Sequence, residues 1–359
     1  MTPATPASFP DWLASRADVV PNKTALVASE RSWSYRELDA EVTRTAYRLA
    51  ARGVRAGDRI ATLLHNGAAS ALLPHAALRL GATLAPLNVR LGEAELAWQL
   101  ESAAPRMTVV EHRTVACATT AGVASVVCVD DDGLIPGDAN VGVRPALRLS
   151  HDAESVAAMI YTSGTTGQPK GAMLTVGNFW WSAIGSALNL GSHADDRWLA
   201  CLPLFHVGGL SIVMRSAIYG IAAVVHDGFD AVAVNHAIDA QKVTIVSLVA
   251  VMLERVLDAR HDRALPSSLR CVLLGGGPAS AALLERCAAI ALPVVQTYGL
   301  TECCSQVATL APEEARHRAR RNRRPPPGRH HRPSCSAYGR RASPQSSAWP
   351  FSSQSGCRG

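Results

Sequence analysis

The feature that most constrains the fold is an alternation of short apolar runs with stretches of helical pattern. Apolar runs typical of buried strands recur at 58–64, 83–87, 107–111, 125–129, 157–162, 198–202, 222–225, 243–248, 270–274 and 293–297. Between them, the spacing of apolar residues predicts helices at 68–80, 176–190, 249–258 and 279–290. Strands that alternate with helices build parallel sheets covered by helices. We therefore expect an α/β fold of layered, largely parallel sheets flanked by helices.

Local signals add one helix boundary and one candidate break. Ser34 and Glu37 have the spacing of a capping box, which predicts a helix that begins there and ends near Gly53. The segment 130–151 is rich in Asp, Gly and Pro, a composition typical of loops. We expect this segment to separate two subdomains of one large domain, residues 1–314.

The last 45 residues, 315–359, have a different composition from the rest of the chain. They contain 11 of the 35 lysine and arginine residues, no Asp or Glu, and no Leu, Ile, Val or Met. Such a segment cannot bury enough apolar area to offset its ordering entropy, so we expect disorder. It is either a basic arm for nucleic acid or anionic surfaces, or the product of a shifted reading frame. The abrupt change after Leu310 favours the shifted frame, so no nucleic-acid partner is expected.

Other features of the sequence bear on where the protein works. No run approaches the roughly 20 apolar residues of a membrane span, and residues 1–10 show no secretory signal. The nine cysteines form no Cys-x-x-Cys pair. These features predict reduced thiols and a cytoplasmic location, with no membrane span. They do not indicate an oligomeric state.

The clearest chemical motif is Tyr161-Thr-Ser-Gly-Thr-Thr-Gly-Gln-Pro-Lys-Gly171, directly after a predicted strand. Hydroxyls, backbone amides freed by glycine, and a cation are what a polyphosphate needs. Lys170 is one of only three lysines in residues 1–315. The order of residues differs from that of a Walker A loop. The motif predicts phosphate contacts from Thr162, Ser163, Gly164, Thr165, Thr166, Gly167 and Lys170.

Three further motifs follow in order: Leu202-Pro-Leu-Phe-His-Val-Gly-Gly209, Leu273-Leu-Gly-Gly-Gly-Pro278 and Gln296-Thr-Tyr-Gly-Leu-Thr-Glu302. Together with the phosphate loop, they resemble the adenylate-forming acyl-CoA synthetases, or AMP-binding enzymes, over about residues 8 to 314. Within this family, the residues of these motifs are most similar to those of the ligases that act on o-succinylbenzoate in menaquinone synthesis. The resemblance implies activation of a carboxylic acid by ATP and transfer to CoA, with Mg²⁺. The alternatives are another aryl or medium-chain acyl-CoA synthetase, or a non-catalytic nucleotide-binding remnant.

The resemblance also assigns roles to residues. Glu302 suits Mg²⁺ as a hard oxygen ligand, although a carboxylate there also suits a helix N-terminus capped by Thr301. Thr301 would contact the α-phosphate, and Tyr298 would stack on adenine. His206 would border the substrate carboxylate rather than act as a base, because a carboxylate has no proton to lose at pH 7. The expected catalytic residues are Lys170, Thr301, Glu302 and His206.

The remaining nucleotide contacts implied by the resemblance are Gly276, Gly277, Pro278, Gln296, Thr297 and Gly299. Ser247 and Gly275 are candidate walls of the acid pocket, with ordinary core packing equally consistent with both. In the family, a later aspartate grips the ribose and a small mobile domain supplies a lysine. No lysine follows Lys242 here. We therefore expect the chain as written to adenylate poorly.

Overall fold

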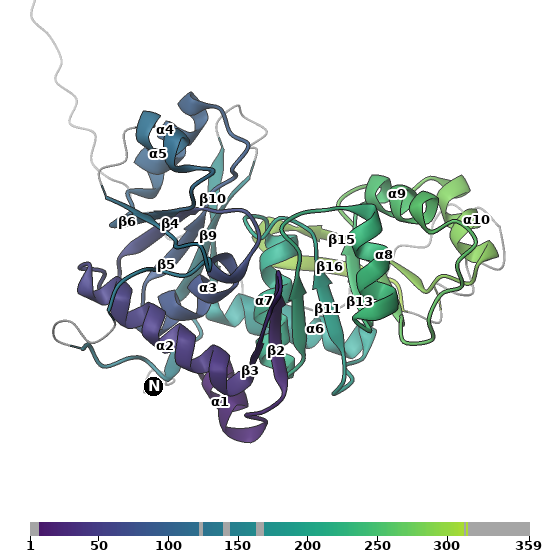
Figure 1. Cartoon of the computed structure of the whole chain (residues 1–359), viewed down its shortest axis with the longest axis horizontal. Coiled ribbons are helices and arrows are strands. Elements are labelled where there is room, and N and C mark those ends of the chain that lie inside the picture. The colour runs from purple at the N-terminus through teal and green to yellow at the C-terminus, as the bar shows by residue number, and fades with distance from the viewer. Residues whose placement is uncertain (1–6, 122–124, 139–143, 163–168, 312–313, 315–359) are drawn as a thin grey trace, which may run out of the picture.

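The computed structural model describes residues 7–121, 125–138, 144–162, 169–311 and 314. Two large sheets dominate it (Figure 1). Most neighbouring strands in both sheets run parallel, and helices cover the faces of the sheets. The predicted α/β fold is confirmed. No helix in the described part of the chain has the length and apolarity needed to cross a bilayer.

The first sheet has six strands. Their order across the sheet is β10 (Lys170–Thr175), β9 (Val156–Thr162), β5 (Thr83–Pro86), β4 (Arg59–Leu63), β6 (Met107–Val110) and β7 (Val126–Cys128). Only β10 runs antiparallel to its neighbour. One face packs against α4 (Glu93–Ala103) and α5 (Val115–Thr120). Helix α3 (Ala68–Leu80) contacts β5 and β9 from the other face.

The second sheet has eight strands. Their order is β16 (Ser305–Thr309), β15 (Val294–Leu300), β14 (Cys271–Leu274), β13 (Ile245–Leu248), β11 (Arg197–Ala200), β12 (Ala222–Val225), β2 (Thr24–Ala28) and β3 (Arg31–Ser34). Each of the two outer strands, β16 and β3, runs antiparallel to its neighbour, and the inner strands run parallel to one another. One face packs against α8 (Ala231–Ala240), α9 (Ala250–Arg260) and α10 (Ala281–Ala289). These three helices lie at the opposite end of the molecule from α4 and α5 (Figure 1).

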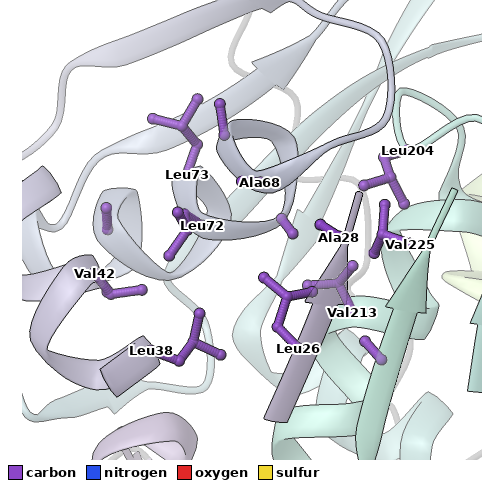
Figure 2. Close-up of a cluster of buried hydrophobic side chains, with 14 of the residues drawn as sticks. Leu26, Ala28, Leu38, Val42, Ala68, Leu72, Leu73, Leu204, Val213 and Val225 are labelled. Atoms are coloured by element: carbon purple, nitrogen blue, oxygen red, sulfur yellow. The ribbon is translucent and has the colours of Figure 1, made fainter. Parts of the chain in front are cut away.

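The largest core cluster joins the two sheets. It contains residues of α2 (Tyr35–Ala51), α3 and α7 (Val207–Tyr219) together with β2 and β12. Figure 2 shows Val42 of α2 and Leu72 of α3 on one side, facing Leu26, Val213 and Val225 on the other. Each such buried side chain contributes about 1.5–3 kcal/mol. The two sheets therefore share one continuous core.

The remaining elements are α1 (Trp12–Val19), α6 (Val176–Leu190), the short 3₁₀ helix η1 (Thr301–Cys303), and a two-stranded sheet of β1 (Ser8–Pro10) and β8 (Ser150–Asp152). The ten predicted strands are present with shifted ends. The predicted capping box is also present, since Ser34 Oγ accepts from the Glu37 amide and the Glu37 carboxylate accepts from the Ser34 amide.

The segment 130–151 does not separate the two sheets. Strands β2 and β3 come before it and join the eight-stranded sheet, whereas β9 and β10 come after it and join the six-stranded sheet. The sheet that a strand joins depends on pairing with strands distant in sequence. The composition of one loop carries no information about that pairing. The predicted tail, 315–359, and loop residues Ser163, Gly164, Thr165, Thr166 and Gly167 lie outside the described residues.

Candidate functional site

A cavity of about 280 Å³ opens at the carboxyl ends of the inner strands of the eight-stranded sheet. This edge is where ligands bind in open α/β sheets. Its walls come from the β11–α7 loop, the ends of β13 and β14, and the β15–β16 hairpin. The lining residues predicted from sequence are His206, Ser247, Gly275, Gly276, Thr297, Gly299 and Thr301. The structure thus brings three of the four motifs to one cavity.

The His206 loop, residues 201–206, forms a tight turn onto the N-terminus of α7. His206 is the N-cap residue of that helix, and its amide donates to the carbonyl of Pro203 at 3.1 Å. A Cβ at Gly209 would lie only 2.3 Å from that same carbonyl oxygen, so the turn requires glycine. Partial burial of the imidazole, followed by the charge of Arg90, lowers the pKa of His206 below its usual value. The ring is therefore neutral at pH 7.

Arg215 is a wall residue that the sequence analysis did not identify. It lies on α7 and is 2% exposed, with Nη2 donating to Ser182 Oγ at 2.8 Å. Its guanidinium carbon lies 5.8 Å from the centre of the Trp198 ring. Within the described residues its Nε has no hydrogen-bond partner. Burial lowers its pKa, and the groups that oppose this are Tyr219 and Cys304 rather than a carboxylate.

This arrangement places a buried positive charge in the cavity wall, with no ion pair to a carboxylate among the described residues. A buried ion costs free energy unless it is paired, so the cavity is suited to an anionic group. The sequence contains a feature that could have identified Arg215: it is the single charged residue in the apolar helical stretch 207–219.

An open ledge borders the cavity. Gly276, Gly277 and Pro278 are exposed after β14, and Gly276 has a φ of +76° with Val249 close by. Tyr298, 59% exposed, extends from the neighbouring strand β15. Gln296 lies on the same strand, where its backbone pairs with Leu274. An exposed aromatic face beside glycine backbone can hold a planar ring.

The phosphate loop and the last motif meet at one hydrogen bond. The Thr162 hydroxyl donates to Glu302 Oε1 at 3.5 Å, and Thr162 pairs with Lys170 across the β9–β10 hairpin. Strand β10, which begins at Lys170, contacts η1, which contains Glu302. Neither Glu302 nor Lys170 lines the cavity itself. They lie beyond its edge, at the end of the hairpin that carries the phosphate motif.

The oxygen atoms of Glu302 and Thr162 fit a magnesium ion. Mg²⁺ binds through one or two carboxylates and keeps its other positions for water and substrate phosphates. A carboxylate 3.5 Å from Thr162, which belongs to the predicted phosphate motif, matches that pattern. Glu302 would hold the ion, and Thr162 Oγ1 lies near its carboxylate.

The family of the chain follows from comparison with known proteins. The chain matches the model of the AMP-binding enzyme family over residues 13–335. A 2-succinylbenzoate–CoA ligase of Geobacillus kaustophilus is 43% identical over 310 residues, which cover 85% of this chain and 61% of that protein. One of Bacillus licheniformis is 43% identical over 305 residues, covering 85% and 62%. The chain therefore spans about three fifths of the length of these relatives.

Solved structures give the same result. The o-succinylbenzoate CoA synthetase (MenE) of Bacillus subtilis, in complex with the acyl-adenylate intermediate OSB-AMP, superposes with a TM-score of 0.80 at 38% identity. The match covers 87% of this chain and 63% of that one. The complex of the same enzyme with ATP and magnesium gives 0.78 at 40% identity, covering 86% and 63%. The N-terminal domain of FACL13 from Mycobacterium tuberculosis gives 0.75 at 28%, covering 86% and 79%. The family match over most of the chain, together with this shared fold, shows that the protein belongs to the AMP-binding enzyme family.

Proposed function

We propose that this chain is an acid–CoA ligase whose acid is o-succinylbenzoate. In the first step a carboxylate oxygen attacks the α-phosphorus of ATP, the new O–P bond forms, and pyrophosphate leaves. In the second step the sulfur of CoA attacks the acyl carbon and AMP leaves. The partners of the chain are thus ATP, CoA and a small carboxylic acid.

The observation that carries the choice of acid is Arg215. The cavity wall is largely apolar, yet it contains this buried guanidinium, which has no carboxylate partner among the described residues. A dicarboxylic acid can place its aromatic body on the apolar wall, one carboxylate on Arg215 and the other toward the nucleotide ledge. An acid with one carboxylate leaves the guanidinium unpaired, which costs binding free energy.

The other residues bind and orient. His206, neutral at pH 7, borders the reacting carboxylate without adding charge. Thr301 lies at the cavity edge, where its hydroxyl can donate to a phosphate oxygen. Lys170 adds positive charge at the end of the phosphate loop. Bound Mg²⁺, held by Glu302, would neutralise charge on the phosphates as pyrophosphate departs.

The test is a comparison of two acids on two proteins. Calorimetry in the presence of AMP measures the affinity of the full chain for o-succinylbenzoate and for benzoate. We expect wild-type protein to prefer the dicarboxylate by at least about tenfold, and Arg215→Gln to lose that preference while its affinity for benzoate changes little. Equal affinity of wild-type protein for the two acids would contradict the choice of acid.

A second measurement tests the reaction itself. Exchange of pyrophosphate into ATP that depends on o-succinylbenzoate supports adenylation by this chain, and its rate tests the expectation of weak activity. Binding of AMP with no exchange, at any acid tried, would favour the non-catalytic nucleotide-binding alternative.

A further inference from the structure

Asn66 is a buried polar residue outside the four motifs. It lies between β4 of the six-stranded sheet and α3, and 7% of its surface is exposed. Its Nδ2 donates to the carbonyl of Leu202 at 2.9 Å. Its Oδ1 accepts from the amide of Leu204 at 2.8 Å. One side chain thus holds two peptide groups of the His206 loop, which belongs to the other sheet.

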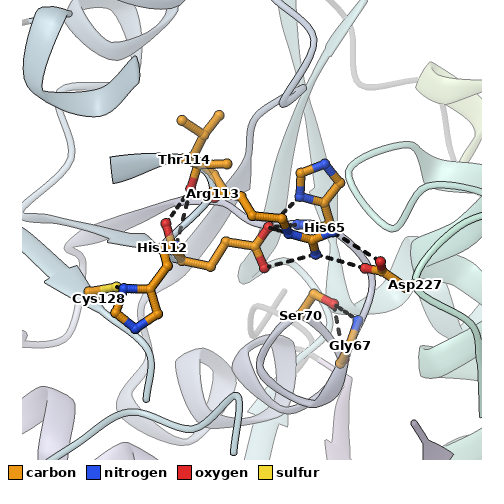
Figure 3. A network of polar contacts seen from close by, with 10 residues as sticks. His65, Gly67, Ser70, His112, Arg113, Thr114, Cys128 and Asp227 are labelled. Atoms are coloured by element: carbon orange, nitrogen blue, oxygen red, sulfur yellow. Dashed lines mark hydrogen bonds and ion pairs between the residues drawn. The ribbon is translucent and has the colours of Figure 1, made fainter. Parts of the chain in front are cut away.

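The segment that carries Asn66 is itself anchored. The Gly67 amide donates to Ser70 Oγ at 2.9 Å, which ties the segment to the first turn of α3. His65 hydrogen-bonds to Glu111. Figure 3 shows His65 and Arg113 beside Asp227, which follows β12 of the eight-stranded sheet. Because Glu111 and Ser70 fix this segment beside the six-stranded sheet, Asn66 has a defined position from which to hold the loop.

The loop that Asn66 holds forms one wall of the cavity. Leu202, Pro203 and His206 line the cavity, and the first of these accepts the Asn66 hydrogen bond. Leu204 and Phe205, between them, are buried. The Phe205 ring lies edge-on to the His206 ring at 4.6 Å between centroids. A shift of the Leu202–Leu204 backbone would therefore move the His206 ring.

We propose that Asn66 is a positioning residue that sets the acid-binding wall of the cavity by holding the His206 loop against the six-stranded sheet. The proposal rests on the proposed function only in taking the ligand of that wall to be a carboxylic acid. The nucleotide ledge comes from other segments, after β14 and along β15, and among the described residues the Asn66 side chain makes no hydrogen bond to them. Loss of Asn66 thus weakens acid binding and spares nucleotide binding.

A purely structural role predicts a different result. Asn235 of α8 provides the matched control, because it is also buried and makes the same kind of contacts. Its Nδ2 donates to the carbonyls of Ala231 and Val256, and its Oδ1 accepts from Arg260. It lies among α8 and α9, away from the cavity. If Asn66 serves stability alone, Asn66→Leu and Asn235→Leu should act alike on ligands.

The experiment uses the full chain with Asn66→Leu, Asn66→Asp and Asn235→Leu. Calorimetry gives the dissociation constants of AMP alone and of o-succinylbenzoate with AMP present. For Asn66→Leu we expect about tenfold weaker acid binding, the effect of two lost hydrogen bonds, and AMP binding within twofold of wild type. Asn66→Asp keeps the acceptor for Leu204 but sets a buried carboxylate oxygen against the Leu202 carbonyl, so it should weaken acid binding at least as much. Asn235→Leu should change neither constant.

A second readout does not depend on the acid. The His206 ring titration is followed by NMR, with the resonance assigned from His206→Gln. In Asn66→Leu the loosened loop lets water reach the ring, so its pKa should rise toward the ordinary value of 6.5 while Arg90 stays in place. In Asn235→Leu it should not change.

The outcomes separate the two proposals. If wild-type protein does not bind o-succinylbenzoate, the proposed function fails, and the His206 titration still decides the role of Asn66. An unchanged His206 titration in Asn66→Leu, or equal losses of AMP and acid affinity, would overturn the positioning role. Should Asn66→Leu not yield folded protein, Asn66→Asp gives the same decision from the same two readouts.

Discussion

Thr162 and Glu302 are 140 positions apart in the chain, yet the hydroxyl of one donates to the carboxylate of the other at 3.5 Å. The contact joins the end of β9, in the six-stranded sheet, to η1, which follows the last parallel strand of the eight-stranded sheet. Thr162 of the predicted phosphate motif and Glu302 of the acidic motif, far apart in sequence, therefore lie side by side where the two sheets meet.

Glu302→Gln tests the metal role of this pair. The amide is isosteric and can still accept from Thr162, but it lacks the charge that holds Mg²⁺. We expect ATP binding in the presence of Mg²⁺ to weaken by about tenfold or more, with binding of AMP in the absence of Mg²⁺ unchanged. Equilibrium titration measures both. Glu285→Gln, an exposed site on α10, is the control, and an equal effect at both sites would contradict the assignment.

Two adjacent glycines in α7 should respond in opposite ways to alanine. A Cβ at Gly209 would lie 2.3 Å from the Pro203 carbonyl oxygen, whereas at Gly208 the nearest neighbour is a Leu202 methyl at 3.6 Å. Gly209→Ala should lower the free energy of unfolding by about 1–3 kcal/mol or more through overpacking. Gly208→Ala should raise it slightly, by up to about 1 kcal/mol, from helix propensity. Chemical denaturation measures both, and a stable Gly209→Ala would argue against the tight turn.

Ser247 both lines the cavity and supports the core. Its Oγ accepts from Trp198 Nε1 at 3.0 Å, so Ser247→Ala leaves a buried indole N–H unpaired. We expect a loss of about 1–3 kcal/mol in the free energy of unfolding. Ser216 is a matched control, because its Oγ is buried without a partner in the described structure. Ser216→Ala should be neutral or slightly stabilising. If thermal denaturation ranks the two variants in the reverse order, the core role of Ser247 is wrong.

His75 should make stability depend on pH between about 4 and 6.5. Burial lowers the pKa of this histidine from 6.5 to about 4, so the unfolded chain binds its proton first as the pH falls. Its stabilising contribution is complete above pH 6.5 and is lost toward pH 4. The shift corresponds to about 3 kcal/mol. Burial raises the pKa of Asp11, but hydrogen bonds from His151 and Arg79 lower it further, to a net value below 3.8. Asp11 therefore affects the pH dependence of stability only below pH 3.8.

His75→Leu isolates that contribution. Urea denaturation at a series of pH values gives the free energy of unfolding of both proteins. The curve of the variant should be flatter than that of wild type between pH 6.5 and 4, because the variant lacks His75. Some slope should remain in both proteins, since both keep His206 and His226, whose pKa values are also lowered. Parallel curves for the two proteins would contradict the assignment.

Runs of apolar residues predicted the buried inner strands but not the partly exposed edge strands. Strands such as β13 and β14 are buried at every position, and a continuous apolar run reports that state directly. Strands β10 and β16 are the antiparallel edge strands beside β9 and β15, and most of their residues are partly or fully exposed. Their apolar content is therefore too low to mark them without knowledge of the strand that each pairs with.

The fold class and the family could be predicted from sequence alone, because both depend on short motifs and on periodicity within single elements. Which groups face each other became visible in the folded chain. In the sequence, Arg215 is a lone charge in an apolar helical stretch; packing places it in a cavity wall, without a carboxylate partner among the described residues. Asn66 and Leu202, 136 positions apart, meet because two sheets share one core. Such contacts arise from the packing of distant segments, which no local pattern encodes.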